Sequence, residues 1–256
     1  MSRISGKNLN KLIKMARGGN TIEEKFLMNL INFIQERKPR EVSMTYKPSS
    51  LHCMRNMYYQ MIGKIQDKNC QSAELIGIGE SGSARHEHIQ KYISDMCTTK
   101  ENYEWVDVAD YIKEHKLDYL EVVSKNGFET KCRHTVLNLS FMCDGILKID
   151  GEYILFEYKT ESCFKFGNRK GVAEEHENQA ACYSLAFDIP KVLFIYENRD
   201  MCGKKAFMYK VTASKKQEIL DKILECDNYI EAGKVPPKEP HKGCKYCKYK
   251  SSCEVD

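Results

Sequence analysis

The chain has 256 residues, of which 42% are hydrophobic and 30% charged, and its 40 basic residues exceed its 36 acidic ones to give a formal net charge of +4. This composition is typical of a globular protein, and no apolar run approaches the length of a membrane-spanning helix, so a membrane protein is excluded. A net charge this small does not by itself indicate nucleic-acid binding.

The start of the chain lacks the pattern of a secretory signal, so the 12 cysteines do not predict a disulfide framework. We expect reduced thiols in a cytoplasmic protein. Leu9, Leu12, Ile13 and Ala16 recur at helical spacing opposite lysines, which predicts an amphipathic helix with a basic face.

Three further helices are predicted in the first hundred residues, over about 21–36, 50–62 and 72–96. Thr21 can cap the first helix, whose inward face is predicted to be Leu27, Leu30, Ile31 and Ile34. The second helix would carry Cys53. In the third helix, a kink or break before His86 is predicted from the spacing of Gly77, Gly79 and Gly82.

After about Tyr119 the hydrophobic period changes to two, which is typical of strands. Strands are predicted at about 128–134, 137–149 and 152–160, followed by a helix at 172–187, strands at 192–196 and 206–211, and a helix at 214–231. This order predicts an α/β or α+β fold with a mixed sheet flanked by helices.

The dipeptide Asp150-Gly151 is a strong signal for a two-residue hairpin turn, and such a turn sets the register of its strands. In that register Asp144 lies directly opposite Glu157, and Lys159 falls on the same face one pleat further along. Two carboxylates placed opposite each other need compensation, and a divalent cation is the most direct form. The alternative is that Glu157 and Lys159 form an ordinary surface pair.

Two helices carry side chains that could complete such a site. His86 is a good ligand for a transition metal such as manganese, whereas magnesium prefers oxygen, although a lone histidine is usually structural and His88 is equally available. Gln179 and Tyr183 are spaced i, i+4, so they share a helix face and could hold a phosphate or base. An ordinary half-buried amphipathic helix explains that spacing equally well.

Cys53 stands alone, and the chain ends in a C-x2-C-x5-C pattern of Cys244, Cys247 and Cys253. Four thiolates suit either a [4Fe-4S] cluster or tetrahedral zinc. Zinc ribbons usually have two C-x2-C pairs, which favours the cluster here. A metal site shared by these distant cysteines requires the two regions to meet, so we expect one domain.

The ordered set of motifs resembles the PD-(D/E)XK nucleases of the RecB-like branch. It is most similar there to the iron-sulfur exonucleases, which include the CRISPR-adaptation exonuclease, the AddB nuclease domain and phage-encoded relatives. The motifs span about residues 49–253 and consist of Cys53, Gly82-x3-His86, Asp144, Glu157-Tyr158-Lys159-Thr160, Gln179-x3-Tyr183 and Cys244-x2-Cys247-x5-Cys253.

This resemblance implies a restriction-endonuclease-like fold and a Mg²⁺- or Mn²⁺-dependent DNA exonuclease. The metal ligands would be His86, Asp144, Glu157 and the backbone carbonyl of Tyr158, and Lys159 would position or activate the attacking water. A bound metal polarises the scissile phosphate and lowers the pKa of its water, so the reaction would be hydrolysis of a phosphodiester bond.

The resemblance also implies that Gln179 and Tyr183 contact DNA, in the form of single strands or free ends. The host process would be recombination, repair, phage replication or CRISPR adaptation, with a recombination or CRISPR-adaptation protein as a partner. A [4Fe-4S] cluster on the four cysteines would join an N-terminal helical region (1–70) and a C-terminal tail (232–256) around a nuclease core (71–231), all within one nuclease domain.

Some residues depart from the family pattern. Phe141 stands where a glycine usually precedes the motif aspartate by three residues, and Asp150 is a rival for that aspartate, although the turn accounts for it. Two other functions stay open. One is a cluster-stabilised DNA-binding or recombination-accessory protein with a weak or unused nuclease centre, and the other is a zinc-stapled regulatory module.

Overall fold

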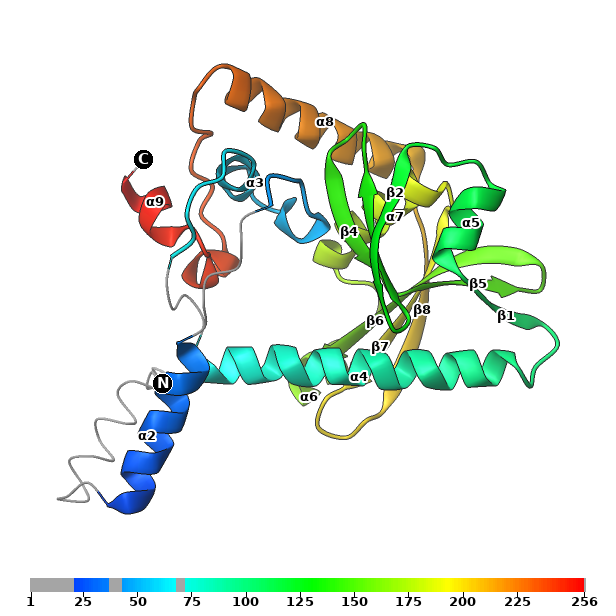
Figure 1. The fold of residues 1–256 in the computed structure, drawn as a ribbon, viewed down its shortest axis with the longest axis horizontal. Helices are drawn as coiled ribbons and strands as arrows, with labels where there is room; N and C mark the ends of the chain where they lie inside the picture. Colours follow the sequence, from blue (N-terminus) through cyan, green and yellow to red (C-terminus); the bar gives the residue numbers. More distant parts are fainter. Residues whose placement is uncertain (1–20, 37–42, 68–71, 256) are drawn as a thin grey trace.

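We describe the protein from a computed structural model of residues 21–36, 43–67 and 72–255 (Figure 1). The amphipathic helix predicted near Leu9 and Ala16 lies outside these residues. The helices are α2 (Ile22–Gln35), α3 (Met54–Met61), α4 (Ala73–Cys97), α5 (Val108–Glu114), α6 (Cys163–Asn168), α7 (Glu174–Phe187), α8 (Ala213–Glu231) and α9 (Lys250–Val255), with short 3₁₀ turns at Pro48–Ser50 and Lys242–Tyr246.

The strands form two sheets. A five-stranded sheet has the order β1 (Tyr103–Val106), β5 (Gly145–Ile149), β6 (Glu152–Glu161), β7 (Lys191–Asn198) and β8 (Lys204–Lys210). A three-stranded antiparallel sheet consists of β2 (Leu120–Asn126), β3 (Glu129–His134) and β4 (Leu139–Cys143). In the larger sheet, β6 and β7 are parallel and the other pairs are antiparallel, so the predicted mixed sheet is confirmed.

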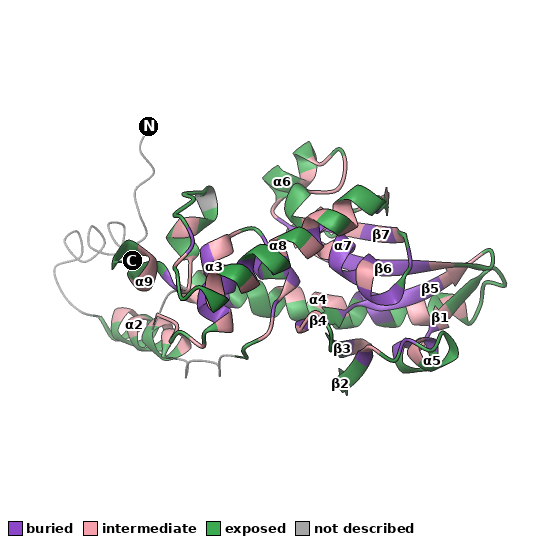
Figure 2. Cartoon of the chain, turned by 90° about the horizontal axis from the view of Figure 1, so that it is seen from above, coloured by how far each residue is buried: buried purple, intermediate pink, exposed green. Residues whose placement is uncertain are grey.

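Helices cover both faces of the larger sheet (Figures 1 and 2). Successive strand residues point to opposite faces, and on β6 Glu157 contacts Gln179 of α7, whereas Tyr158 packs against His86 of α4. Ile89 of α4 joins Leu147, Phe156 and Tyr158 in a small apolar cluster on the α4 face, and a larger core reaches α3, α7 and α8. The sheet is therefore flanked by helices, as predicted.

The Asp150-Gly151 turn joins β5 to β6, as its sequence predicts. Both residues have positive φ, at 50° and 84°, which is the conformation that a two-residue hairpin of this type requires. The ladder pairs Ile149 with Glu152 and ends with Gly145 opposite Phe156, which is the predicted register. Within the described chain, no helix is long and apolar enough to cross a membrane.

The predicted strand over 137–149 is wrong in one respect, because it is two strands in two sheets. Its first part, β4, pairs with β3, and its second part, β5, pairs with β1 and β6. Asp144 is the single residue between β4 and β5. It lies just beyond the last pair of the β5–β6 ladder, so it is not paired with Glu157 as predicted. The change of sheet depends on Gly145, where an added Cβ would lie 2.7 Å from Cη2 of Trp105.

The break predicted in the third helix is also wrong, because α4 is continuous over 25 residues. The Ser72 side chain caps its N-terminus, and Gly77 and Gly79 meet no atom that an added Cβ would touch. Each glycine costs a helix about 1 kcal/mol relative to alanine, which packing on the sheet can offset. His86 therefore lies in the middle of a long helix.

At the N-terminal side, α2 starts as predicted, with Thr21 and Glu24 forming a capping box. Its predicted inward face is wrong for Leu27 and Leu30, which are exposed, because α2 leans on α4 away from the core and none of its residues is buried (Figure 1). Cys53 precedes α3 as its N-cap residue instead of lying within the helix.

Candidate metal centre and cysteine site

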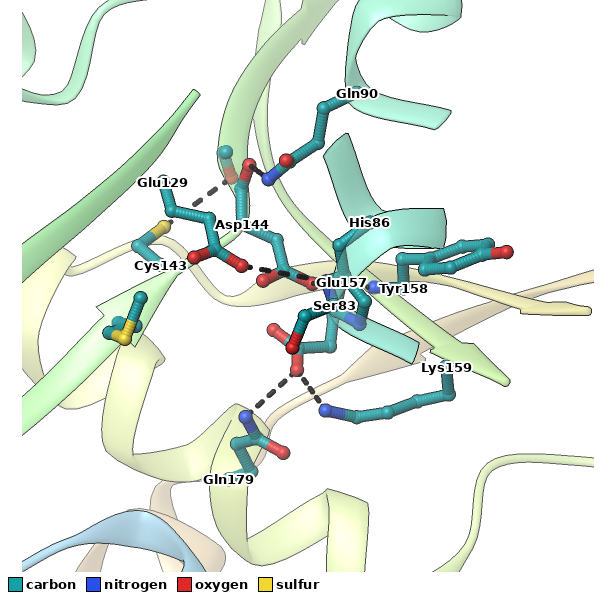
Figure 3. A network of polar contacts seen from close by, with 12 residues as sticks. Ser83, His86, Gln90, Glu129, Cys143, Asp144, Glu157, Tyr158, Lys159 and Gln179 are labelled. Carbon is teal, nitrogen blue, oxygen red and sulfur yellow. Dashed lines mark hydrogen bonds and ion pairs between the residues drawn. The ribbon is translucent and has the colours of Figure 1, made fainter. Parts of the chain in front are cut away.

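Asp144 is held firmly at the junction between the two sheets. Its Oδ2 accepts a hydrogen bond from the backbone N–H of Tyr158 at 2.8 Å, and its carbonyl accepts one from Nε2 of Gln90 at 2.7 Å. The carboxylate is therefore next to β6 although Asp144 is not part of the ladder. The two sheets separate at this point, so side chains from α4, β3 and β6 can all reach the carboxylate (Figure 3).

Three potential metal ligands meet beside this junction. Nδ1 of His86 lies 3.3 Å from Oδ2 of Asp144 and 3.8 Å from Oε1 of Glu129. One ligand atom from each of the three residues falls within 4.8 Å of the others. The sequence analysis missed Glu129, which lies at the start of β3, one residue before the Thr130 that pairs with Cys143. Only the pairing of β3 with β4 would have pointed to it.

Glu157, Lys159 and Gln179 form the other half of the site. Oε1 of Glu157 accepts hydrogen bonds from Nζ of Lys159 and, at 2.8 Å, from Nε2 of Gln179. Oε2 of Glu157 is buried and accepts no hydrogen bond from the described residues. A buried carboxylate oxygen is expensive to leave without a partner, so this atom is suited to a cation.

The charges of the site act strongly on one another. Burial raises the pKa of Glu157 to about 7, and the charge of Asp144 adds to the rise, while Lys159 and His86 oppose it. Burial lowers the pKa of Lys159, but Glu157 and Asp144 outweigh it and the net shift is upward. Burial and Asp144 also raise the pKa of Glu129. The carboxylates of Glu129, Asp144 and Glu157 therefore carry more negative charge than Lys159 alone can neutralise.

The neighbouring carboxylates also change the pKa of His86. Burial lowers the pKa of its imidazole, but the hydrogen bond and charge of Asp144 outweigh burial and raise the pKa overall. Three carboxylates and one imidazole are a donor set that fits a divalent cation, and the imidazole suits manganese better than magnesium.

The remaining predicted residues lie close by. Nε2 of Gln179 is 2.6 Å from the hydroxyl of Tyr183, which donates to the carbonyl of Met142 at 2.7 Å. Tyr183 is buried, and its role here is to support Gln179. The Tyr158 ring packs edge-on against His86 with centroids 4.9 Å apart. DNA contact by Gln179 and Tyr183, and metal binding by the Tyr158 carbonyl, stay predictions.

The four predicted cluster cysteines line one cavity of about 660 Å³ between α3 and the C-terminal tail. Among the residues described, only His86, Glu129 and Asp144 form a ligand group within 4.8 Å, so no three of these sulfur atoms lie that close together. A tetrahedral zinc ion with bonds of about 2.3 Å would hold its sulfur ligands about 3.8 Å apart. No three of the four sulfur atoms are therefore as close together as in a tetrahedral zinc site.

Three of the sulfur atoms accept hydrogen bonds. The backbone N–H groups of His241 and Tyr249 donate to Cys244 and Cys247 at 3.3 and 3.4 Å, and Nη1 of Arg55 donates to Cys253 at 3.5 Å. Burial raises the pKa of Cys53 and Cys247, so these thiols are not strongly acidic by themselves.

No protein-family model matches this chain, and no curated protein matches it. Among solved structures, it is similar to SSO0001, with 16% identity over 91% of this chain and 96% of that one and a TM-score of 0.45.

It is also similar to the alkaline exonuclease LHK-Exo from Laribacter hongkongensis, with 14% identity over 75% of this chain and 92% of that one and a TM-score of 0.42. The LHK-Exo complex with dAMP gives 15% identity over 74% and 89% and a TM-score of 0.45.

Proposed function

We propose that the protein is a divalent-metal-dependent DNA exonuclease of the PD-(D/E)XK type, with a restriction-endonuclease-like fold. The observation that carries the proposal is the meeting of Asp144, the unpartnered Oε2 of Glu157 and the ammonium group of Lys159 at the junction of the two sheets. This arrangement agrees with the resemblance of the motifs to RecB-like nucleases that act on DNA ends or single strands.

His86, Glu129, Asp144 and Glu157 would hold the cation. When bound, it would polarise the scissile phosphate and lower the pKa of a water molecule. Lys159 is kept charged by Glu157 and Asp144, so it can donate hydrogen bonds to the attacking water or to a phosphate oxygen rather than act as a base.

Gln179 has a positioning role in this mechanism. It donates to the same Glu157 oxygen as Lys159, and the other Glu157 oxygen, Oε2, has no hydrogen-bond partner among the described residues. The Gln179 side chain is fixed in turn by Tyr183. Within the described residues, this chain of contacts orients Glu157 without adding another charge to the site.

The test is a nuclease assay with Mg²⁺ or Mn²⁺ on single-stranded and duplex DNA. Asp144→Asn, Glu157→Gln and Lys159→Met should each lower the rate about a hundredfold or more, because each removes a charge that acts on the transition state. Glu152→Gln is the control, because Glu152 pairs with Lys191 at the turn end of the same strand. Full activity in all three site variants would refute the proposal, and metal-independent DNA affinity without cleavage would favour an accessory role.

We also propose that Cys53, Cys244, Cys247 and Cys253 hold a [4Fe-4S] cluster that unites the N-terminal helical region, the core and the tail in one domain. The proposal is supported by the cavity that all four cysteines line and by their sequence spacing, which differs from the two C-x2-C pairs of a zinc ribbon. Anaerobic purification should yield iron and acid-labile sulfide in equal amounts. Stoichiometric zinc without sulfide would contradict this assignment.

A further inference from the structure

Two neighbouring segments lie at the end of the larger sheet where the C-termini of β6 and β7 meet. These strands are parallel, so α6, which follows β6, and the β7–β8 turn (residues 199–203) leave the sheet at the same edge. The backbone N–H of Cys163 donates to Asp200 at 3.0 Å, and that of Arg199 donates to the carbonyl of Glu161 at 2.8 Å. The two segments are thus joined, a few residues beyond Lys159.

Each of these segments exposes one large apolar side chain. Phe164 of α6 is 82% exposed and Met201 of the turn is 76% exposed. Phe166, two residues later on the helix, is turned toward the core instead. Single exposed apolar side chains are normal on a protein surface, so the significance of Phe164 depends on its fixed backbone and its charged neighbours.

The backbone that carries Phe164 is held in place from several sides. Nζ of Lys205 donates to the carbonyls of Phe166 and Arg169 at 2.8 and 3.1 Å. The Arg169 guanidinium pairs with buried Glu161 and stacks on the Tyr196 ring, 4.5 Å from its centroid. The Phe164 ring therefore projects from a fixed platform, which lowers the entropy that a partner must overcome to stack on it.

The two segments around Phe164 carry more bases than acids, and two of these bases, Arg169 and Lys204, pair with the buried carboxylates of Glu161 and Glu197. Residues 162–171 contain Lys165, Arg169 and Lys170 and no acid, and residues 199–205 contain three bases and one acid, Asp200. Arg169 of the first segment and His176 of α7 both contact the Tyr196 side chain of β7. Burial and the positive charges of Lys159, Arg169 and Lys165 together lower the pKa of His176 to about 3.

We infer that α6 and the β7–β8 turn hold a single strand of DNA beside the metal centre, with the Phe164 ring stacked on an unpaired base and Lys165 and Lys170 near its phosphates. This inference rests on the proposed nuclease function and specifies how the substrate strand is held. An exposed ring among lysines is the combination that binds single strands without reading their sequence, because every base has a π-face. Phe166 of α6 packs against the same core as α7, the helix that carries Gln179.

The experiment measures binding of the full chain to a fluorescein-labelled single-stranded oligonucleotide by anisotropy, in EDTA so that cleavage is absent. Phe164→Ala should weaken binding about tenfold, and Phe164→Trp should retain it, because stacking needs only an aromatic face. The control is Phe33→Ala, since Phe33 of α2 is 76% exposed and lies outside these two segments. Circular dichroism melts verify that each variant is folded.

A second measurement locates the stacked base. An oligonucleotide series with 2-aminopurine at successive positions should show one quenched position with wild type and with Phe164→Trp, and no such position with Phe164→Ala. Replacing that base by an abasic site should remove the difference in affinity between wild type and Phe164→Ala.

Equal affinity of wild type and Phe164→Ala would overturn the inference while leaving the nuclease proposal intact, provided that wild type cleaves DNA when metal is added. Equal weakening by Phe164→Ala with the normal and the abasic oligonucleotide would also overturn it. A wild type that neither binds nor cleaves DNA would overturn both proposals.

Discussion

At the scale of single residues, His176 shows how burial and neighbouring positive charges make stability depend on pH. Its Nδ1 lies 2.8 Å from the hydroxyl of Tyr196, and its ring stacks near Tyr196 and Phe194. Burial, with the charges of Lys159, Arg169 and Lys165, lowers its pKa to about 3, so the folded protein keeps the imidazole neutral.

This neutral histidine predicts a specific loss of stability in acid. Below a pH of about 6.5 the unfolded chain takes up a proton at His176 that the folded chain does not, so the free energy of unfolding falls by up to about 1.4 kcal/mol per pH unit from this residue. His176→Gln should remove that contribution and keep a partner for Tyr196. Urea unfolding at pH 7.5 and pH 5 measures it, and equal pH dependence of both proteins would show that His176 is protonated in the folded state.

Glu129 is a candidate metal ligand that the structure reveals and the sequence motifs do not contain. It approaches His86 and Asp144 from β3, whereas the other ligands come from α4, the sheet junction and β6. If it is a ligand, Glu129→Gln should weaken Mn²⁺ binding about tenfold or more, because a charged ligand is lost from a partly buried site. Titration calorimetry measures the affinity. Glu121→Gln on exposed β2 is the control, and unchanged binding by Glu129→Gln would exclude Glu129 as a ligand.

At the scale of elements, glycines have opposite effects in α4 and β5. In α4, Gly79 has open space where a Cβ would lie, and the helix continues straight through it. In β5, Gly145 lies against the Trp105 ring of β1. Gly79 therefore lowers the stability of α4, whereas Gly145 allows the backbone of β5 to lie close to the Trp105 ring.

Alanine substitutions should separate the two cases. Gly79→Ala should stabilise the protein by about 0.5–1 kcal/mol through helix propensity, and Gly145→Ala should destabilise it by about 1–3 kcal/mol because the indole must move. Chemical denaturation monitored by circular dichroism compares them. Destabilisation by Gly79→Ala would mean that α4 bends at that glycine.

The same elements show which features could be predicted from the sequence. Local signals were sufficient for the Asp150-Gly151 turn, the register of β5 and β6, and the helix that carries Gln179, since each depends on residues close together in the chain. The break between β4 and β5 could not be found in this way, because Asp144 lies in an apolar run that reads as one strand. It depends on Trp105 of distant β1 and on the change of partner strand.

In the candidate site, too, the residues that depend on local sequence were predicted and those that depend on distant strand pairing were not. Asp144, Glu157 and Lys159 were reached from the hairpin register, although the structure brings Asp144 to the site from beyond the ladder. Glu129 was missed, because its position depends on the pairing of β3 with β4. The exposure of Phe164 likewise depends on contacts between α6 and the β7–β8 turn, which no local pattern indicates.

At the scale of the whole molecule, Arg55 connects α3 to the tail independently of any metal. Its Nε donates to the carbonyl of Pro236 at 2.8 Å, and its Nη1 donates to the carbonyl of Cys253 at 3.0 Å and also to the sulfur of that cysteine. The guanidinium is mostly buried, so its loss would leave carbonyl oxygens without a donor. The tail should therefore be the first region to detach when Arg55 is replaced.

Arg55→Gln should increase hydrogen exchange in the tail, at residues 242–255, by an amount that corresponds to about 2 kcal/mol, while exchange in β7 stays slow, because the tail opens before the core unfolds. The measurement is hydrogen exchange by mass spectrometry on protein as purified and after removal of metal by a chelator. A metal held by the cysteines should reduce the difference between the two proteins. Arg133→Gln, which removes an exposed contact with Asn138 in the smaller sheet, is the matched control. Unchanged tail exchange in metal-free Arg55→Gln would mean that Arg55 does not hold the tail.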